Sequence, residues 1–158
     1  MIRPISANDI PQIIAILRDI QEAGDSYYFL DMNDDELQNY WIKQDFAAFV
    51  FEQNGEVAGS YILGKVADGR FSHIANASYI VSQKHRGLGI AKKLGLHSIE
   101  FAKEQGYHAI QFMRVVSTNE NAVNAWKNLG FSIIGTVPKA FNHKHLGFVD
   151  VHIMHREV

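Results

Sequence analysis

The sequence of 158 residues contains no cysteine. This absence excludes disulfide bonds, a thiolate zinc site and a cysteine nucleophile. The chain also lacks an excess of positive charge, because its formal net charge is -2, and we therefore expect no nucleic-acid partner. The opening residues, MIRPISANDI, lack the apolar stretch of a secretory signal, so we expect a cytoplasmic protein that does not bind a membrane.

What the chain contains is an ordinary globular composition, with 47% hydrophobic and 20% charged residues. It has no internal repeat, no low-complexity segment and no linker. At this length we expect a single domain over residues 1–158, either as a monomer or as a homodimer.

The first part of the chain predicts a short strand and two helices. After a turn, Ile10, Ile13, Ile14 and Leu17 recur at the spacing of one helix face. Further on, the stretch NDDELQNYWI begins at residue 33 with an asparagine followed three residues later by a glutamate, the pattern of a capping box. The acidic residues of this stretch could also attract an amine.

The remaining chain predicts strands and two further helices. Residues 47–66 form two apolar runs around Asn54-Gly55, a pair typical of a type I′ hairpin. Further strands are predicted at residues 73–82, 108–116, 131–137 and 148–157, with a helix that ends near Gly106 before the second of these. This order predicts an α/β (α+β) fold with a mixed sheet of about seven strands and about four helices.

The stretch QKHRGLGIAKKL, residues 83–94, lies between a predicted strand and a helix. Two glycines allow the backbone N–H groups to approach a ligand, and the helix N-terminus adds unpaired donors, which together suit a phosphate. Arg86 adds a forked cation, with Lys84 and His85 as outer contacts. A dinucleotide fingerprint would need a glycine where Lys92 stands, and a glycine turn that serves packing alone remains an alternative.

Two signatures together resemble the GNAT superfamily of N-acyltransferases. VSQKHRGLGIAKKL resembles its acyl-coenzyme A binding motif, which Arg86, Gly89 and Ala91 match. Downstream, STNENAVNAWKNLGF resembles the second signature of the family, with matches at Asn119, Ala122, Trp126, Gly130 and Phe131. The resemblance implies a central sheet splayed between its fourth and fifth strands.

The resemblance also implies where acetyl-coenzyme A binds. The pantetheine would pair with the backbone of Ile80 and Val81, and the N–H of Val81 would polarise the thioester carbonyl. Asn119 would contact the pantetheine or merely cap the helix that follows, and Ala122 and Trp126 on that helix would flank the thiol end. The pyrophosphate would lie on the loop formed by Arg86, Gly87, Leu88, Gly89, Ile90 and Ala91.

The catalytic groups depart from the family pattern. Many members place a tyrosine where Trp126 stands, but an indole N–H cannot act as an acid near neutral pH, so solvent or Ser117 would protonate the leaving thiolate. The strand at residues 73–82 contains no carboxylate, which leaves His73, ahead of Asn76, as the candidate general base.

The implied activity is transfer of an acetyl group to the primary amine of a small molecule. Alternatives are a non-catalytic module that binds acyl-coenzyme A, or acetylation of a protein amine. The YYFL run at residues 27–30 with Trp41, and residues 138–147 with Asp150, could border the acceptor site. We expect no metal, because the histidines near the C-terminus need not converge and no carboxylate pattern accompanies them.

Overall fold

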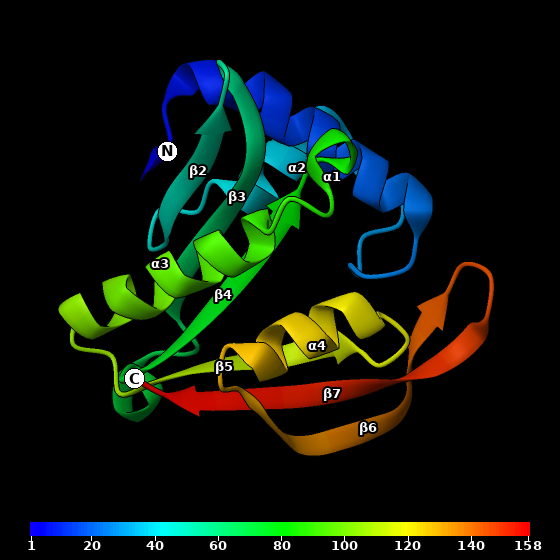
Figure 1. Ribbon diagram of the computed structural model, residues 1–158. Helices are drawn as coiled ribbons and strands as arrows, with labels where there is room; N and C mark the ends of the chain where they lie inside the picture. Colours follow the sequence, from blue (N-terminus) through cyan, green and yellow to red (C-terminus); the bar gives the residue numbers. More distant parts are fainter.

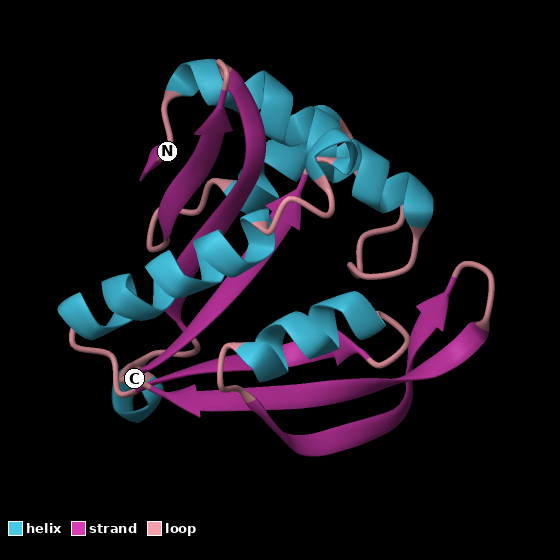
Figure 2. Cartoon of the chain, in the orientation of Figure 1, coloured by secondary structure: helices cyan, strands magenta, loops and turns pink.

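The computed structural model describes residues 1–158 as a mixed sheet with helices on both faces (Figures 1 and 2). The sheet has seven strands in the order β1-β2-β3-β4-β5-β7-β6. The strands are β1 (Ile2–Pro4), β2 (Ala47–Gln53), β3 (Glu56–Lys65), β4 (Ile74–Val81), β5 (Ala109–Val116), β6 (Ser132–His143) and β7 (Gly147–Glu157). The α-helices are α1 (Ile10–Ala23), α2 (Asp34–Trp41), α3 (Ile90–Glu104) and α4 (Glu120–Asn128).

Only β4 and β5 are parallel neighbours, and they pair at one end alone. Ile74 is opposite Ala109 and Ala75 is opposite Ile110, after which no pairing continues. Figure 1 shows the two strands diverging from this closed end. The prediction of a mixed seven-stranded sheet parted between its fourth and fifth strands is therefore confirmed.

The helices form two layers, each with its own core. One core joins the sheet to α3 and α4 and includes Leu94, Ile99 and Trp126. The other joins it to α1 and α2 and includes Leu17, Leu37 and Ile80. The gap between β4 and β5 therefore lies between two helical layers that pack on opposite faces of the sheet.

Local sequence signals account for the ends of several elements. The Asn33 side chain accepts a bond from the Glu36 N–H at 3.0 Å, while the Glu36 carboxylate accepts from the Asn33 N–H at 2.8 Å, which confirms the capping box. Asn54 and Gly55 both have positive φ, as a type I′ turn requires.

Two predictions about element details are corrected. The buried face of α1 carries Ile13, Ile16, Leu17 and Ile20, so it is rotated from the predicted face, which began at Ile10. Strand β6 continues past Pro138 to His143 because it is the edge strand, where a residue without an N–H is tolerated. No helix of the structure is both long and apolar enough to span a membrane.

Candidate active site

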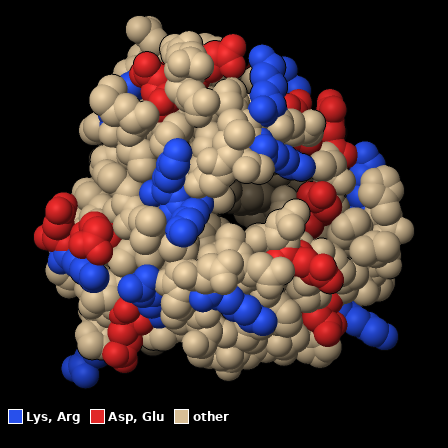
Figure 3. Space-filling model, viewed as in Figure 1, with Lys and Arg blue, Asp and Glu red and all other residues tan.

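A cavity of about 690 Å³ occupies the gap between β4 and β5. Its walls include Asn119, Ala122 and Trp126 at the α4 layer and Tyr40 and Lys43 at the α2 layer. The cavity therefore extends through the parted sheet from one helical layer to the other. The hollow near the centre of Figure 3 lies over this gap, with Lys, Arg, Asp and Glu side chains around its rim.

The register of β4 decides which of its backbone groups face the gap. The N–H of Ser82 donates to the carbonyl of Ala58, and the N–H of Val66 donates to the carbonyl of Ile74, so even-numbered residues of β4 bond to β3. Ile80 is one of these, which corrects the prediction that its backbone faces the gap. Tyr79 and Val81 face the gap instead.

The Tyr27 hydroxyl holds the backbone of Tyr79. It donates to the Tyr79 carbonyl at 2.8 Å and accepts from the Tyr79 N–H at 3.1 Å. One side chain thus makes the two hydrogen bonds that a paired strand would have made at this residue. Within this pair of cleft-facing residues, Val81 is the one that remains available to an added strand.

The loop before α3 and the first turn of α3 present free backbone donors. No backbone or side-chain acceptor bonds the N–H groups of residues 87–92. Gly87 and Gly89 adopt positive φ values of 79° and 71°, and a Cβ added at either would have no neighbour within 4 Å. Arg86 is exposed and forms no ion pair, whereas the Lys84 and His85 side chains lie 3.9 and 4.0 Å from the Glu56 carboxylate. These features suit the phosphates of an anionic ligand.

The start of α4 borders the cavity. The Asn119 side chain accepts from the Ala122 N–H at 3.3 Å, so it caps the helix while also lining the cavity. Trp126 is 8% exposed, and its ring centroid is 4.5 Å from that of Tyr79 and 5.0 Å from that of Phe112. Its indole is therefore a packed wall of the cavity.

The cavity contains phenols and cations but no carboxylate and no imidazole. Burial raises the pKa of Tyr27 and Tyr79 far above the ordinary value. Burial also raises the pKa of Tyr40 to about 12. Partial burial, and secondarily the charge of Arg114, lower the pKa of Lys43. Tyr27, Tyr40 and Tyr79 therefore stay protonated at neutral pH and cannot act as general bases.

The two predicted catalytic residues occupy different places. His73 lies at the closed end, where its carbonyl accepts from the His108 N–H at 2.8 Å and its exposed ring is 6.3 Å from that of His108. This position does not support a role as general base in the gap. Ser117 follows β5 at the open end, with its N–H bonded to the Asp150 carbonyl, but its side chain does not line the cavity.

Other predicted acceptor-site residues divide between wall and core. Tyr27 and Tyr28 line the cavity, whereas Phe29 and Trp41 are buried in the α1–α2 core. From the segment 138–147, the cavity is bordered by Ala140 and Phe141. The Asp150 carboxylate accepts from the Lys139 N–H at 2.9 Å and thereby supports this segment.

Sequence reasoning missed Arg114 and Lys43, which both line the cavity. β5 has a register shift between Phe112 and Val115, and the exposed Met113 and Arg114 lie in this bulge. A charge inside the apolar run QFMRVV was the available signal. The bulge itself depends on pairing with β7, which the local sequence does not reveal.

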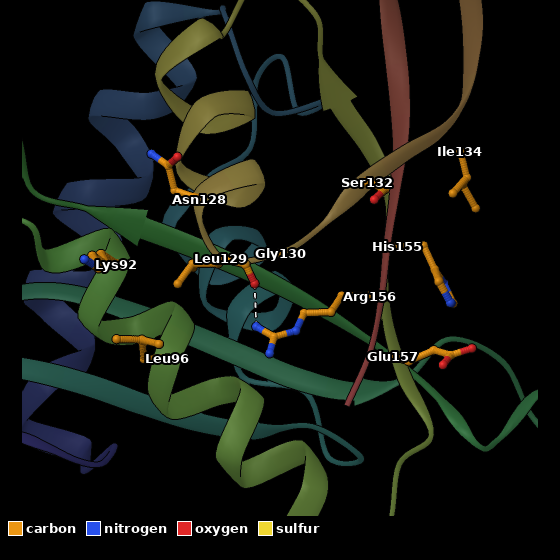
Figure 4. A pocket seen from close by; sticks show the side chains of 10 residues that line it. All are labelled: Lys92, Leu96, Asn128, Leu129, Gly130, Ser132, Ile134, His155, Arg156 and Glu157. Atoms are coloured by element: carbon orange, nitrogen blue, oxygen red, sulfur yellow. Dashed lines mark hydrogen bonds between the residues drawn. The ribbon is translucent and has the colours of Figure 1, made fainter.

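A second, more open hollow of about 840 Å³ lies between α3 and the turn from α4 into β6 (Figure 4). Figure 4 shows the Arg156 guanidinium directed at the backbone beside Gly130, where it donates to the Leu129 carbonyl. Because this arginine already bonds the C-terminal end of α4, we assign it a structural role. No predicted site residue lines this hollow.

Residues 12–131 match the model of the acetyltransferase (GNAT) family. The chain belongs to this family. The GNAT resemblance of the two signatures is thereby confirmed. A relative described as N-alpha-acetyltransferase, from Sulfurisphaera tokodaii, is 30% identical over 97% of this chain and 90% of its own. The N-acetyltransferase aca1 of Schizosaccharomyces pombe is 31% identical over 69% of this chain, which spans only 53% of that protein.

Solved structures share the whole GNAT fold. A GCN5-related N-acetyltransferase from Kribbella flavida is 36% identical, with a TM-score of 0.95 over 100% of this chain and 97% of its own. A Salmonella typhimurium protein, solved with its cofactor acetyl-CoA, has a TM-score of 0.88 at 23% identity over 99% of this chain and 92% of its own. At that identity the second match establishes the fold alone.

Proposed function

We propose that residues 1–158 form one N-acetyltransferase domain that moves an acetyl group from acetyl-coenzyme A to the primary amine of a small molecule. The observation that carries this proposal is that the free amides at residues 87–92 follow β4, the strand that parts from β5 around a cavity. Membership of the GNAT family supports the same activity. In this proposal the cosubstrate is acetyl-coenzyme A, no metal takes part, and the domain acts in the cytoplasm as a monomer or homodimer.

The residues present fit acetyl-coenzyme A. The loop formed by Arg86, Gly87, Leu88, Gly89, Ile90 and Ala91 would hold the pyrophosphate through unpaired N–H groups and the guanidinium. Val81 would bond the pantetheine, with Asn119, Ala122 and Trp126 along the opposite wall. When bound, the coenzyme supplies a thioester carbonyl as the acyl donor.

The transfer itself needs little acid–base chemistry from the chain. The amine nitrogen attacks the carbonyl carbon, so a C–N bond forms and the C–S bond breaks, while water accepts the proton of the amine. The sulfur then takes up a proton, and since an ordinary thiol has a pKa of about 8.5, water suffices as the donor. Ser117, which directly follows the cavity residue Val116, is the candidate side chain for this step.

The cavity favours the neutral amine that this attack requires. An ammonium ion entering it meets the positive charges of Arg114 and Lys43 and no carboxylate. Like charge and partial loss of water both lower the pKa of such a substrate. Bulk water can therefore remove the proton without a dedicated base.

Acetylation of a protein amine is the second candidate. An adjoining groove of about 1210 Å³, lined by Glu22, Asp31, Asp34 and Asp35 among others, shares Tyr27 and Tyr28 with the cavity. It offers room for a peptide and negative charge for its amine. The name N-alpha-acetyltransferase of one relative points in the same direction.

The test combines coenzyme binding with turnover. We expect calorimetry to detect coenzyme A binding, and thiol release from acetyl-coenzyme A to rise when a suitable amine from a panel is added. Ser117→Ala should slow release if Ser117 donates the proton, whereas His73→Ala should leave it unchanged. Binding without thiol release from any amine or peptide would instead identify a non-catalytic module, and no binding would overturn the proposal.

A further inference from the structure

Two cations lie on neighbouring aromatic rings at the α2 side of the cavity. The Arg114 guanidinium carbon is 5.6 Å from the Tyr28 ring centroid, and the Lys43 Nζ is 5.0 Å from that of Tyr40. The two rings are themselves 5.5 Å apart. Cation–π contact and ring packing therefore hold both charges at one wall of the cavity.

Neither cation has an anionic partner within the chain. Arg114 and Lys43 form no ion pair, and no acceptor bonds either side chain. The lining of the cavity contains no aspartate or glutamate, and the acidic residues nearby line the adjoining groove instead. Two like charges that no acidic side chain of the protein neutralises attract an anion.

The anion that Arg114 and Lys43 attract would lie at a different place from the phosphates of the coenzyme. The free amides that suit a pyrophosphate lie at the N-terminal end of α3 and in the loop before it, and α3 packs in the same core as α4. The Lys43 ammonium lies over the ring of Tyr40. Tyr40 packs against the other core, which the sheet forms with α1 and α2. The two cationic places therefore belong to opposite faces of the sheet, and the cavity runs between them.

We propose that the acceptor of this enzyme is an amine that also carries a carboxylate, such as a free amino acid, and that Arg114 and Lys43 bind this carboxylate. The inference rests on the proposed acetyl transfer and names the class of acceptor. The guanidinium offers two parallel donors to the carboxylate, which fixes its orientation, and the ammonium adds a point charge. The amine of the same molecule is then directed into the gap toward Val81 and the thioester.

This recognition separates small acceptors from peptide N-termini. The carboxylate of the first residue of a peptide is consumed in an amide bond and cannot pair with either cation. A neutral amide in its place leaves both charges without a partner. We therefore expect free acids to be preferred over their carboxamides and over peptides.

The experiment compares matched acceptors in the wild type and in two variants. Each common amino acid, its carboxamide, the corresponding decarboxylated amine and a tripeptide beginning with that residue are assayed by thiol release. For the best acid, kcat/KM should exceed that of its carboxamide by about 10- to 100-fold, the range of a hydrogen bond to a charged group. Arg114→Gln and Lys43→Met should each reduce this preference at least several-fold.

Two controls tie the effect to the carboxylate. The KM for acetyl-coenzyme A should be unchanged in both variants, because neither residue belongs to the loop that holds the pyrophosphate. Arg70→Gln, which removes an exposed arginine outside the cavity, should keep the full preference for acids. A preference for amines or peptides without a free carboxylate, or a preference for acids that survives both substitutions, would overturn the inference.

A binding measurement separates this inference from the proposed activity. Amino acids and their N-acetyl derivatives are titrated into the protein and followed by NMR. If no amine is acetylated but acids bind to the wild type and not to Arg114→Gln, the carboxylate site stands and the transfer activity fails. If acids neither bind nor react, the carboxylate site is refuted.

Discussion

The Tyr27 hydroxyl links the loop after α1 to the open edge of β4. It makes hydrogen bonds of 2.8 and 3.1 Å with the carbonyl and N–H of Tyr79. We expect Tyr27→Phe to lower the free energy of unfolding by about 1–3 kcal/mol, because two backbone groups lose their partner. Chemical denaturation without ligand measures this change.

Tyr28→Phe is the matched control for this prediction. The Tyr28 side chain is half exposed, and its hydroxyl makes no hydrogen bond within the chain. Its substitution should change stability by less than about 0.5 kcal/mol. Equal effects of the two substitutions would show that the Tyr27 hydroxyl does not stabilise β4.

At the residue scale, the sequence predicted roles that depend on neighbouring residues but not contacts between remote segments. Asn33 and Asn119 cap the helices that follow them, since a cap depends only on the next three residues. The partners of Tyr27 and Lys43 come from remote segments. Their places in the cavity required the tertiary structure.

The loop between β4 and α3 is the element on which coenzyme binding depends. Gly89 has a φ of 71°, and a Cβ added there would point into open space. We expect Gly89→Ala to cost about 1 kcal/mol of stability and to raise the Kd for coenzyme A at least several-fold, because the methyl group stands where the phosphates approach. Denaturation and calorimetry measure the two effects.

Gly69→Ala separates backbone strain from ligand contact. Gly69 has a φ of 63° and likewise no neighbour within 4 Å of an added Cβ, but it precedes β4 at the closed end of the gap. The Gly69→Ala variant should lose about as much stability as Gly89→Ala and keep the wild-type affinity for coenzyme A. A similar loss of affinity in both variants would contradict the assignment of the phosphate site.

At the element scale, the sequence predicted the type and order of the strands and helices. Turn chemistry and apolar periodicity are local properties, which is why the hairpin at Asn54-Gly55 and the helix after Gly89 were identified. The bulge in β5 and the passage of β6 through Pro138 depend on neighbouring strands. The parting of β4 from β5 came from the family resemblance.

At the scale of the whole molecule, a buried carboxylate, that of Asp9, connects the N-terminal strand to the first helix. Asp9 is 3% exposed, and the Arg3 guanidinium donates to both its oxygens at 2.8 Å. The hydrogen bond from Arg3, with further bonds from Ser6, holds the pKa of Asp9 well below its usual range. The side chain thereby ties β1 to the start of α1.

This arrangement predicts a loss of stability in acid. A carboxyl group whose pKa is lower in the folded state stabilises the fold fully above its unfolded pKa of about 3.9, and this stabilisation declines as the pH falls toward the folded value. We expect the midpoint temperature of thermal unfolding to decrease as the pH is lowered from about 4. The decrease should be smaller in Asp9→Asn. Asp25→Asn, which changes an exposed residue, should keep the wild-type slope; identical slopes in all three proteins would contradict the role of Asp9.

The split in the sheet has a mechanical consequence for the molecule. β4 and β5 are joined by two residue pairs at the closed end, which can serve as a hinge. The α1–α2 core draws every one of its buried members from residues 13–80, on one side of that hinge, whereas the α3–α4 core draws from both sides. Rotation of the C-terminal strands to admit a bulkier acyl chain would therefore repack one core and leave the other undisturbed.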